Sequence, residues 1–240
     1  FSWSQARFNL PGWVDNRILT GLGLLLVIVI ADGVWRENQE FSAKVTALGG
    51  DVWVAPDDGE APRLLKLNDR VVDYNIIRTG PTGWAQLSFP DGSVLALDSN
   101  TTLKVKLLEY HRGGAWRSRN FMVLAGRIFA RVGENFGAES KMNVYTPACV
   151  AAVRGTRFSV EVQPDGKTVR TVCNDGTVEL RGFNGQSAYV SNGADATARP
   201  GETPSRPVVA SAADLAAFRH ASMNQIIRTD PWYIQIGLTV

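Results

Sequence analysis

Histidine and cysteine are scarce in this sequence, with two of each among 240 residues. His111 and His220 lie in no cluster of cysteine or carboxylate residues with metal-ligand spacing. No Gly-x-Ser-x-Gly, His-Glu-x-x-His, P-loop or Cys-x-x-Cys motif occurs either. We therefore expect no catalytic residues, no metal site, no cofactor and no small-molecule substrate, and so a protein that is not an enzyme.

An excess of one charge is also missing. The chain has 25 Lys and Arg residues against 23 Asp and Glu residues, for a formal net charge of +2. The basic residues are spread along the chain and form no patch, which argues against nucleic acid as a partner.

The two cysteines, Cys149 and Cys173, are just enough for one disulfide. A bridge would suit an oxidising compartment. Two buried thiols that pack as small apolar side chains are equally compatible with the sequence. Spacing alone does not place the two α-carbons within reach of each other, so both possibilities stay open.

One long hydrophobic run is present, from residue 18 to residue 35. As a helix it rises about 27 Å, which approaches the hydrocarbon thickness of a bilayer. A buried core helix would show a polar face, and a signal peptide would end in a better cleavage site, so we predict a transmembrane helix after a short interfacial or cytoplasmic segment, 1–17. The expected membrane anchor residues are Trp13, Arg17, Leu22, Leu25, Val29, Trp35 and Arg36.

Residues 45–192 lack helical periodicity and consist of short alternating or β-branched runs separated by Gly, Pro, Asn and Asp. Turn signals occur at Asp91-Gly92, at 164–166 and at Asp175-Gly176. This pattern predicts an all-β domain with a sandwich, barrel or solenoid architecture.

The chain ends in a segment rich in Pro, Ala and Thr (193–209), which we interpret as a linker, and a region that we expect to contain an amphipathic helix and an apolar tail (210–240). Ser211 is the expected N-cap of that helix, with Asp214 three residues later. The tail either completes the β domain or binds a partner. The candidate partner-binding residues are Phe218, Trp232, Tyr233, Ile234, Ile236 and Leu238.

A series of short motifs follows in a fixed order along the β region. They are Gly50-Asp51-Val52, Ile77-Arg78-Thr79-Gly80, Ala85-Gln86-Leu87, Phe89-Pro90-Asp91-Gly92-Ser93, Leu97-Asp98-Ser99-Asn100-Thr101, Leu124-Ala125-Gly126-Arg127-Ile128, Thr146-Pro147, Val153-Arg154-Gly155-Thr156-Arg157-Phe158 and Asp175-Gly176-Thr177-Val178. In this order the motifs resemble the FecR domain, the periplasmic β domain of FecR-type membrane proteins. From the residues themselves we expect structural roles, with Gly92 and Gly176 in hairpin turns and Gly155 at a bulge or close backbone approach.

The resemblance implies a place in the cell as well as a fold. FecR domains lie outside the cytoplasmic membrane of bacteria, so we expect a single-pass inner-membrane protein with a cytoplasmic N-terminus and a periplasmic β domain. A bridge between Cys149 and Cys173 would fit that compartment. Because only 17 residues precede the expected span, we expect the family's cytoplasmic sigma-regulating domain to be lacking.

Two functions follow from this organisation, and a third is kept in view. The favoured hypothesis is an accessory or scaffold subunit that stabilises a larger membrane protein complex, with a photosynthetic or respiratory complex as a speculative host and with integral membrane subunits and the lipid bilayer as partners. The alternative is a FecR-type transmembrane signalling regulator, an anti-sigma factor. An envelope glycan-binding module would require an exposed aromatic platform, for which Trp53, Trp84 and Trp116 are candidates.

Overall fold

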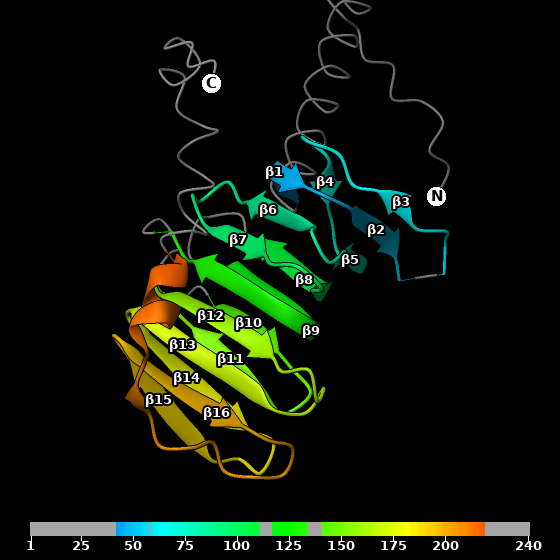
Figure 1. Ribbon diagram of the computed structural model, residues 1–240. Helices are drawn as coiled ribbons and strands as arrows, with labels where there is room; N and C mark the ends of the chain where they lie inside the picture. The colour runs from blue at the N-terminus through cyan, green and yellow to red at the C-terminus, as the bar shows by residue number, and fades with distance from the viewer. Residues whose placement is uncertain (1–41, 58, 111–116, 134–140, 219–240) are drawn as a thin grey trace, which may run out of the picture. The chain divides into compact units, whose positions relative to one another are not determined.

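The computed structural model describes residues 42–57, 59–110, 117–133 and 141–218 (Figure 1). The expected transmembrane helix, its anchor residues from Trp13 to Arg36, and the tail residues from Trp232 to Leu238 lie outside these ranges. Within the described ranges no helix has the length and apolar character needed to cross a bilayer. The described part is mostly β, with one short C-terminal helix, 212–218.

The strands form two sheets, which we call A and B. Sheet A contains, in spatial order, β4 (Arg70–Val71), β1 (Ala43–Gly49), β6 (Trp84–Ser88), β7 (Val94–Leu97), the second half of β9 (Arg117–Arg131), β12 (Arg157–Val162), β13 (Val169–Asp175), β16 (Ala194–Ala198) and β17 (Val208–Val209). Sheet B contains β3 (Arg63–Leu64), β2 (Val52–Pro56), β5 (Asn75–Thr79), β8 (Thr102–Tyr110), the first half of β9, β10 (Lys141–Tyr145), β11 (Cys149–Val153), β14 (Thr177–Gly182) and β15 (Ser187–Ser191). Neighbouring strands are antiparallel except β9 and β10, which are parallel.

The core lies between the two sheets and follows from the period-2 alternation of the strands. In β12, Phe158, Val160 and Val162 are buried, and in β10 the same is true of Met142 and Val144. Residues from both sheets belong to one hydrophobic cluster. Fully burying each large apolar side chain stabilises the fold by about 1.5–3 kcal/mol, which fixes the register because a one-residue slip would expose the whole set.

The chain passes repeatedly from one sheet to the other, and the crossings use residues in the left-handed backbone region. Five of these residues are Gly50 (φ 61°), Asn100 (φ 52°), Gly126 (φ 76°), Gly155 (φ 59°) and Gly176 (φ 88°). Each lies between a strand of one sheet and a strand of the other, or, for Gly126, inside β9 where it changes sheets. The predicted all-β domain is therefore a two-sheet structure, built from hairpins in one sheet and then in the other (Figure 1).

Gly126 is the crossing point of the longest strand. Before it, β9 pairs with β8 and β10 in sheet B, and from it onward β9 pairs with β12 and then also β7 in sheet A. A Cβ atom at residue 126 would lie 2.5 Å from the backbone oxygen of Asn100 and 2.5 Å from the hydroxyl of Thr101. Both the positive φ and the lack of space therefore require glycine here.

Several predicted strand boundaries are corrected by these crossings. The β-branched run at 45–55 predicts a single strand, but it forms two strands in different sheets, β1 and β2. The run at 149–162 also predicts one strand and forms β11 and β12. Asp175-Gly176 was predicted to form a hairpin turn, but here the chain passes from β13 in sheet A to β14 in sheet B. Gly92 (φ 82°) lies in the β6–β7 hairpin, as predicted. Gly155 is part of a corner and no bulge inside one strand.

The predicted linker 193–209 is also corrected. Residues Ala194–Ala198 form β16, which pairs with β13 along its whole length, and Val208–Val209 form β17. Ala196 and Ala198 of this strand are buried in the core, and Ala194 packs against the core while partly buried. Its Ala- and Thr-rich composition suggested an extended linker because small side chains give a weak hydrophobic signal.

Helix 212–218 begins as predicted. The backbone N–H of Asp214 donates to the Ser211 hydroxyl at 3.1 Å, so Ser211 is the N-cap. Phe218, predicted to bind a partner, is instead buried against the domain's own sheet A, with its ring 5.3 Å from that of Phe129 in an edge-to-face arrangement. The helix needs this contact because its apolar stripe would otherwise face water.

Candidate interaction surface

The hairpin motif from Phe89 to Ser93 holds a buried ion pair. Asp91 accepts hydrogen bonds from both the backbone N–H and the hydroxyl of Ser93, and its carboxylate pairs with the Arg119 guanidinium at 2.9 and 3.0 Å. The Arg119 guanidinium also stacks 4.3 Å from the Phe89 ring centre. Burial alone would raise the pKa of Asp91, but the bonds and charge of Arg119 together with Ser93 lower it overall.

That network explains the motif in structural terms. Asp91 is 4% exposed and Arg119 is 6% exposed, so neither group is available to a substrate. A buried pair whose hydrogen-bonding capacity is used stabilises one conformation of the hairpin. Removing one partner would leave an uncompensated buried charge, at a cost of about 3–5 kcal/mol.

The threonines in two other motifs hydrogen-bond to backbone groups where the chain passes from one sheet to the other. Thr101 donates its hydroxyl to the carbonyl of Arg127 at 3.1 Å and accepts the Arg127 N–H at 3.0 Å. Thr156 donates to the carbonyls of Arg154 at 2.9 Å and Thr177 at 3.1 Å. Both threonines are buried, so the Arg-Gly-Thr and Asn-Thr motifs satisfy backbone groups at corners, and no anion-binding loop is formed.

The possible disulfide is not formed, and both cysteines are free and buried. Cys149 pairs with Gly182 at the end of β14, whereas the Cys173 thiol donates to the carbonyl of Gly176 at 3.4 Å, just before β14 begins. The six residues of strand between 176 and 182 extend over about 20 Å. A disulfide requires α-carbons within about 7 Å, so the two thiols lie too far apart to bridge.

The aromatic platform proposed for glycan binding is not assembled by the described residues. Trp53 lies on β2 in sheet B and Trp84 on β6 in sheet A. Trp116 lies outside the described residues. Trp53 lines a separate small pocket of about 210 Å³, together with Ile76 and Arg78.

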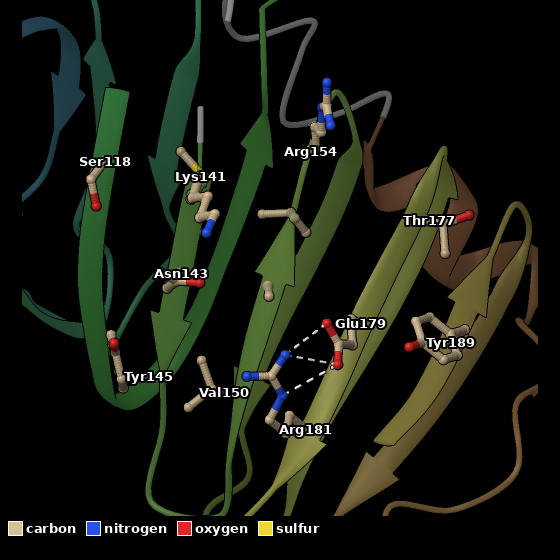
Figure 2. A pocket seen from close by; sticks show the side chains of 13 residues that line it. Ser118, Lys141, Asn143, Tyr145, Val150, Arg154, Thr177, Glu179, Arg181 and Tyr189 are labelled. Atoms are coloured by element: carbon tan, nitrogen blue, oxygen red, sulfur yellow. Dashed lines mark hydrogen bonds and ion pairs between the residues drawn. The ribbon is translucent and has the colours of Figure 1, made fainter. Parts of the chain in front are cut away.

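The outer faces of the two sheets differ. Helix 212–218 covers part of sheet A through Phe218 and through Asp214, which accepts two hydrogen bonds from the Arg170 guanidinium. The outer face of sheet B instead carries a wide depression of about 1060 Å³ (Figure 2). It extends over five neighbouring strands, from β9 to β15.

The depression is a groove whose floor is β11. Strand register places Ala152 between Asn143 on β10 and Glu179 on β14, and places Val150 between Tyr145 and Arg181. The short side chains of β11 thus lie between rows of longer ones, and Tyr189 on β15 lies directly opposite Glu179. A groove forms because side-chain size differs across strands that share one face.

Positive charge predominates along this groove. Arg181 is bonded to Glu179 at 2.9 Å, and this contact lowers the pKa of the Glu179 carboxyl. Lys141 and Arg154 line the groove at its other end, both exposed, and neither pairs with a carboxylate among the described residues (Figure 2). Lys106 lies 4.7 Å above the ring of Tyr145 and adds to the positive charge of this face.

Three groove residues, Val153, Arg154 and Thr177, lie within the sequence motifs, but no groove residue was predicted to bind a partner. The signal that could have found them is the alternation of outward polar residues in two runs, Lys141-Asn143-Tyr145 and Thr177-Glu179-Arg181. That alternation indicates a solvent-facing strand face, but it does not say which strands are neighbours. The groove depends on β11 pairing with β14 and not with β12, its neighbour in sequence.

Comparison with known proteins agrees with the fold. The two-sheet architecture with closed corners defines an all-β domain, and residues 75–179 match the family model described as FecR protein, from β5 to within β14. The resemblance seen in the sequence is therefore confirmed for residues 75–179, which match the FecR domain. A search of curated proteins finds no match.

Two solved structures resemble the chain as well. Both are crystal structures, at 1.65 and 2.50 Å resolution, of a protein from Parabacteroides distasonis assigned provisionally as an anti-sigma factor. Each has a TM-score of 0.48 and 15% sequence identity, and covers 65% of this chain and 78% of its own.

Proposed function

We propose that this chain is the sensing part of a FecR-type membrane-anchored signalling regulator, and that it acts by binding other proteins and not by catalysis. The observation that carries this proposal is the FecR match over residues 75–179. The corner and hairpin motifs inside this range have structural roles, which leaves the outer faces of the sheets for contact with partners.

The family match favours the signalling hypothesis over the scaffold hypothesis. A FecR-type regulator receives a signal outside the cytoplasmic membrane and relays it inward, so the proposal includes a periplasmic β domain and a membrane anchor within 18–35. The accessory-subunit hypothesis stays a prediction, and nothing in the described residues selects a photosynthetic or respiratory host.

Deletion of the gene in its host, followed by measurement of all transcripts, tests the proposal. A signalling regulator changes a small set of co-regulated promoters, and reintroduction of the gene restores them. A scaffold subunit instead lowers the amount of one membrane complex on native gels while the promoters stay unchanged. That second pattern would replace the signalling function with the scaffold function.

A surface variant that leaves the fold intact serves as the control for complementation. A strain carrying a variant that leaves the sandwich intact, such as Glu202→Gln on the exposed β16–β17 connection, should restore the transcripts as the wild-type gene does. Failure of this control would show that the complementation system, and not the proposal, is at fault.

A further inference from the structure

We infer that the groove on sheet B holds an extended, acidic segment of a partner protein, which lies along β11. This inference rests on the proposed function in that both require a protein partner. It adds the surface that is used and the chemistry of the segment that fits there.

The shape of the groove argues for an extended chain. Its floor residues, Val150 and Ala152, lie between two rows of longer side chains. One row is on β10 and the other on β14, and both rows run alongside β11. A partner segment of about five residues in a β conformation has the same length as this strand, about 17 Å. Small side chains of such a segment could lie against Ala152, where a bulky one would be excluded by Asn143 and Glu179.

The charges argue for acidic residues in the segment. Lys141 and Arg154 lie near one end of the groove without a carboxylate partner among the described residues, whereas Arg181 at the other end is bonded to Glu179. A carboxylate at this end of the groove would be attracted by the positive charges of both Lys141 and Arg154. Carboxylates are therefore expected at this end of the segment.

The aromatic side chains supply further contacts at the groove walls. Tyr189 is 63% exposed on β15, which pairs with β14 on one side only among the described strands. Exposed tyrosines of this kind provide apolar contact area and a hydrogen-bonding hydroxyl at little entropic cost. On the outer face of sheet A, by contrast, Phe218 already covers Phe129 and Val172.

A direct binding measurement tests the inference on the full-length chain in detergent. The probe is a fluorescein-labelled peptide in which Glu and Asp alternate with Ala and Val, and the control peptide replaces the acids with Gln and Asn. Fluorescence anisotropy should show the acidic peptide binding on the order of tenfold more tightly, with an affinity that falls as salt screens the exposed charges.

Variants of the groove should then lose the acidic peptide. The double variant Lys141→Glu, Arg154→Glu reverses both free charges and should weaken binding by at least about tenfold. Ala152→Trp should do the same by filling the floor. The matched control reverses two exposed charges away from the groove, Lys167→Glu on the β12–β13 hairpin and Arg206→Glu on the β16–β17 connection, and should bind as the wild type does.

Circular dichroism of each variant separates lost binding from lost folding. The inference is overturned if folded groove variants still bind the acidic peptide fully, or if the neutral peptide binds equally well. Binding only to vesicles that contain anionic phospholipid would assign the charges to a membrane surface and would also overturn it.

The two proposals fail in different ways. If the groove variants lose the peptide but the deletion strain shows no change in transcripts, the groove stands and the signalling function falls. If transcripts change on deletion but groove variants restore them fully, the signalling function stands and the groove is not its partner site.

Discussion

The Arg170 guanidinium on β13 donates two parallel hydrogen bonds, of 2.9 and 2.8 Å, to the Asp214 carboxylate on helix 212–218. The same guanidinium donates a third bond, of 2.9 Å, to Asp195 on β16. One side chain therefore joins two strands of sheet A to the C-terminal helix. The ring contact between Phe218 and Phe129 forms a second point of attachment for the same helix.

Replacement of Asp214 by Asn should loosen this helix. The substitution removes a bidentate charge-assisted pair that is only partly exposed, which should destabilise helix docking by about 1–2 kcal/mol. Hydrogen exchange of the amides of 212–218 should become about tenfold faster or more, while exchange in β12 and β13 stays unchanged. Glu202→Gln removes an exposed pair at 4.0 Å and should change exchange in neither region.

Helix docking should also weaken in acid. The hydrogen bond from Arg170 holds the pKa of Asp214 below its ordinary value, so the pair stabilises the docked helix fully above the unfolded pKa of about 4. This stabilisation is lost as the pH falls below that value and through the lower folded pKa. The difference in amide protection between wild type and Asp214→Asn should therefore be large at neutral pH and shrink below about pH 4; a difference that grew in acid would contradict the role given to Arg170.

Replacement of Gly126 by Ala should destabilise the domain more than the same change at another left-handed glycine. At Gly126 a methyl group meets the backbone of Asn100 and Thr101, while at Gly185 (φ 82°) nothing lies within 4 Å. Gly185→Ala therefore carries only the conformational cost of about 1–2 kcal/mol. Gly126→Ala should exceed it by at least about 2 kcal/mol in urea unfolding, and equal losses would show that β9 can bend elsewhere.

The sequence predicted the class of fold because strand periodicity and turn residues are local properties. The core faces of β10 and β12, the hairpin at Gly92 and the N-cap at Ser211 all follow from neighbouring residues. Gly155 and Gly176 were recognised as special backbone positions, but local pattern does not distinguish a bulge or a hairpin turn from passage to a second sheet.

The candidate site was out of reach of the sequence for a related reason. The groove exists because β11 lies between β10 and β14, and that order depends on pairing between segments far apart in the chain. Phe218 was assigned to a partner because its covering residues, Phe129 and Val172, lie on strands distant in sequence. Both errors come from long-range packing, which hydrophobic pattern alone does not encode.

The two thiols should be inert in the folded protein. Burial raises the pKa of Cys149, and burial raises the pKa of Cys173 to about 11, so neither is ionised at neutral pH. Because the thiolate is the reactive form, maleimide should label the native chain very slowly and label both residues after denaturation. Denatured, unreduced protein that still failed to react would indicate a disulfide and would contradict the free thiols of the structure.

Replacement of threonine by valine at two buried positions should change the free energy of unfolding in opposite directions. The Thr171 hydroxyl on β13 is buried and has no hydrogen-bond partner in the described part of the chain. Because Thr171→Val removes a hydroxyl that loses its water on folding and gains no hydrogen bond, it should stabilise the fold by about 1 kcal/mol. Thr156→Val leaves the carbonyls of Arg154 and Thr177 without their donor and should destabilise it by about 1–3 kcal/mol. The midpoints of urea unfolding should therefore move in opposite directions from the wild-type value. If both variants were destabilised, Thr171 would have a partner, such as a buried water, and its hydroxyl would contribute to stability as that of Thr156 does.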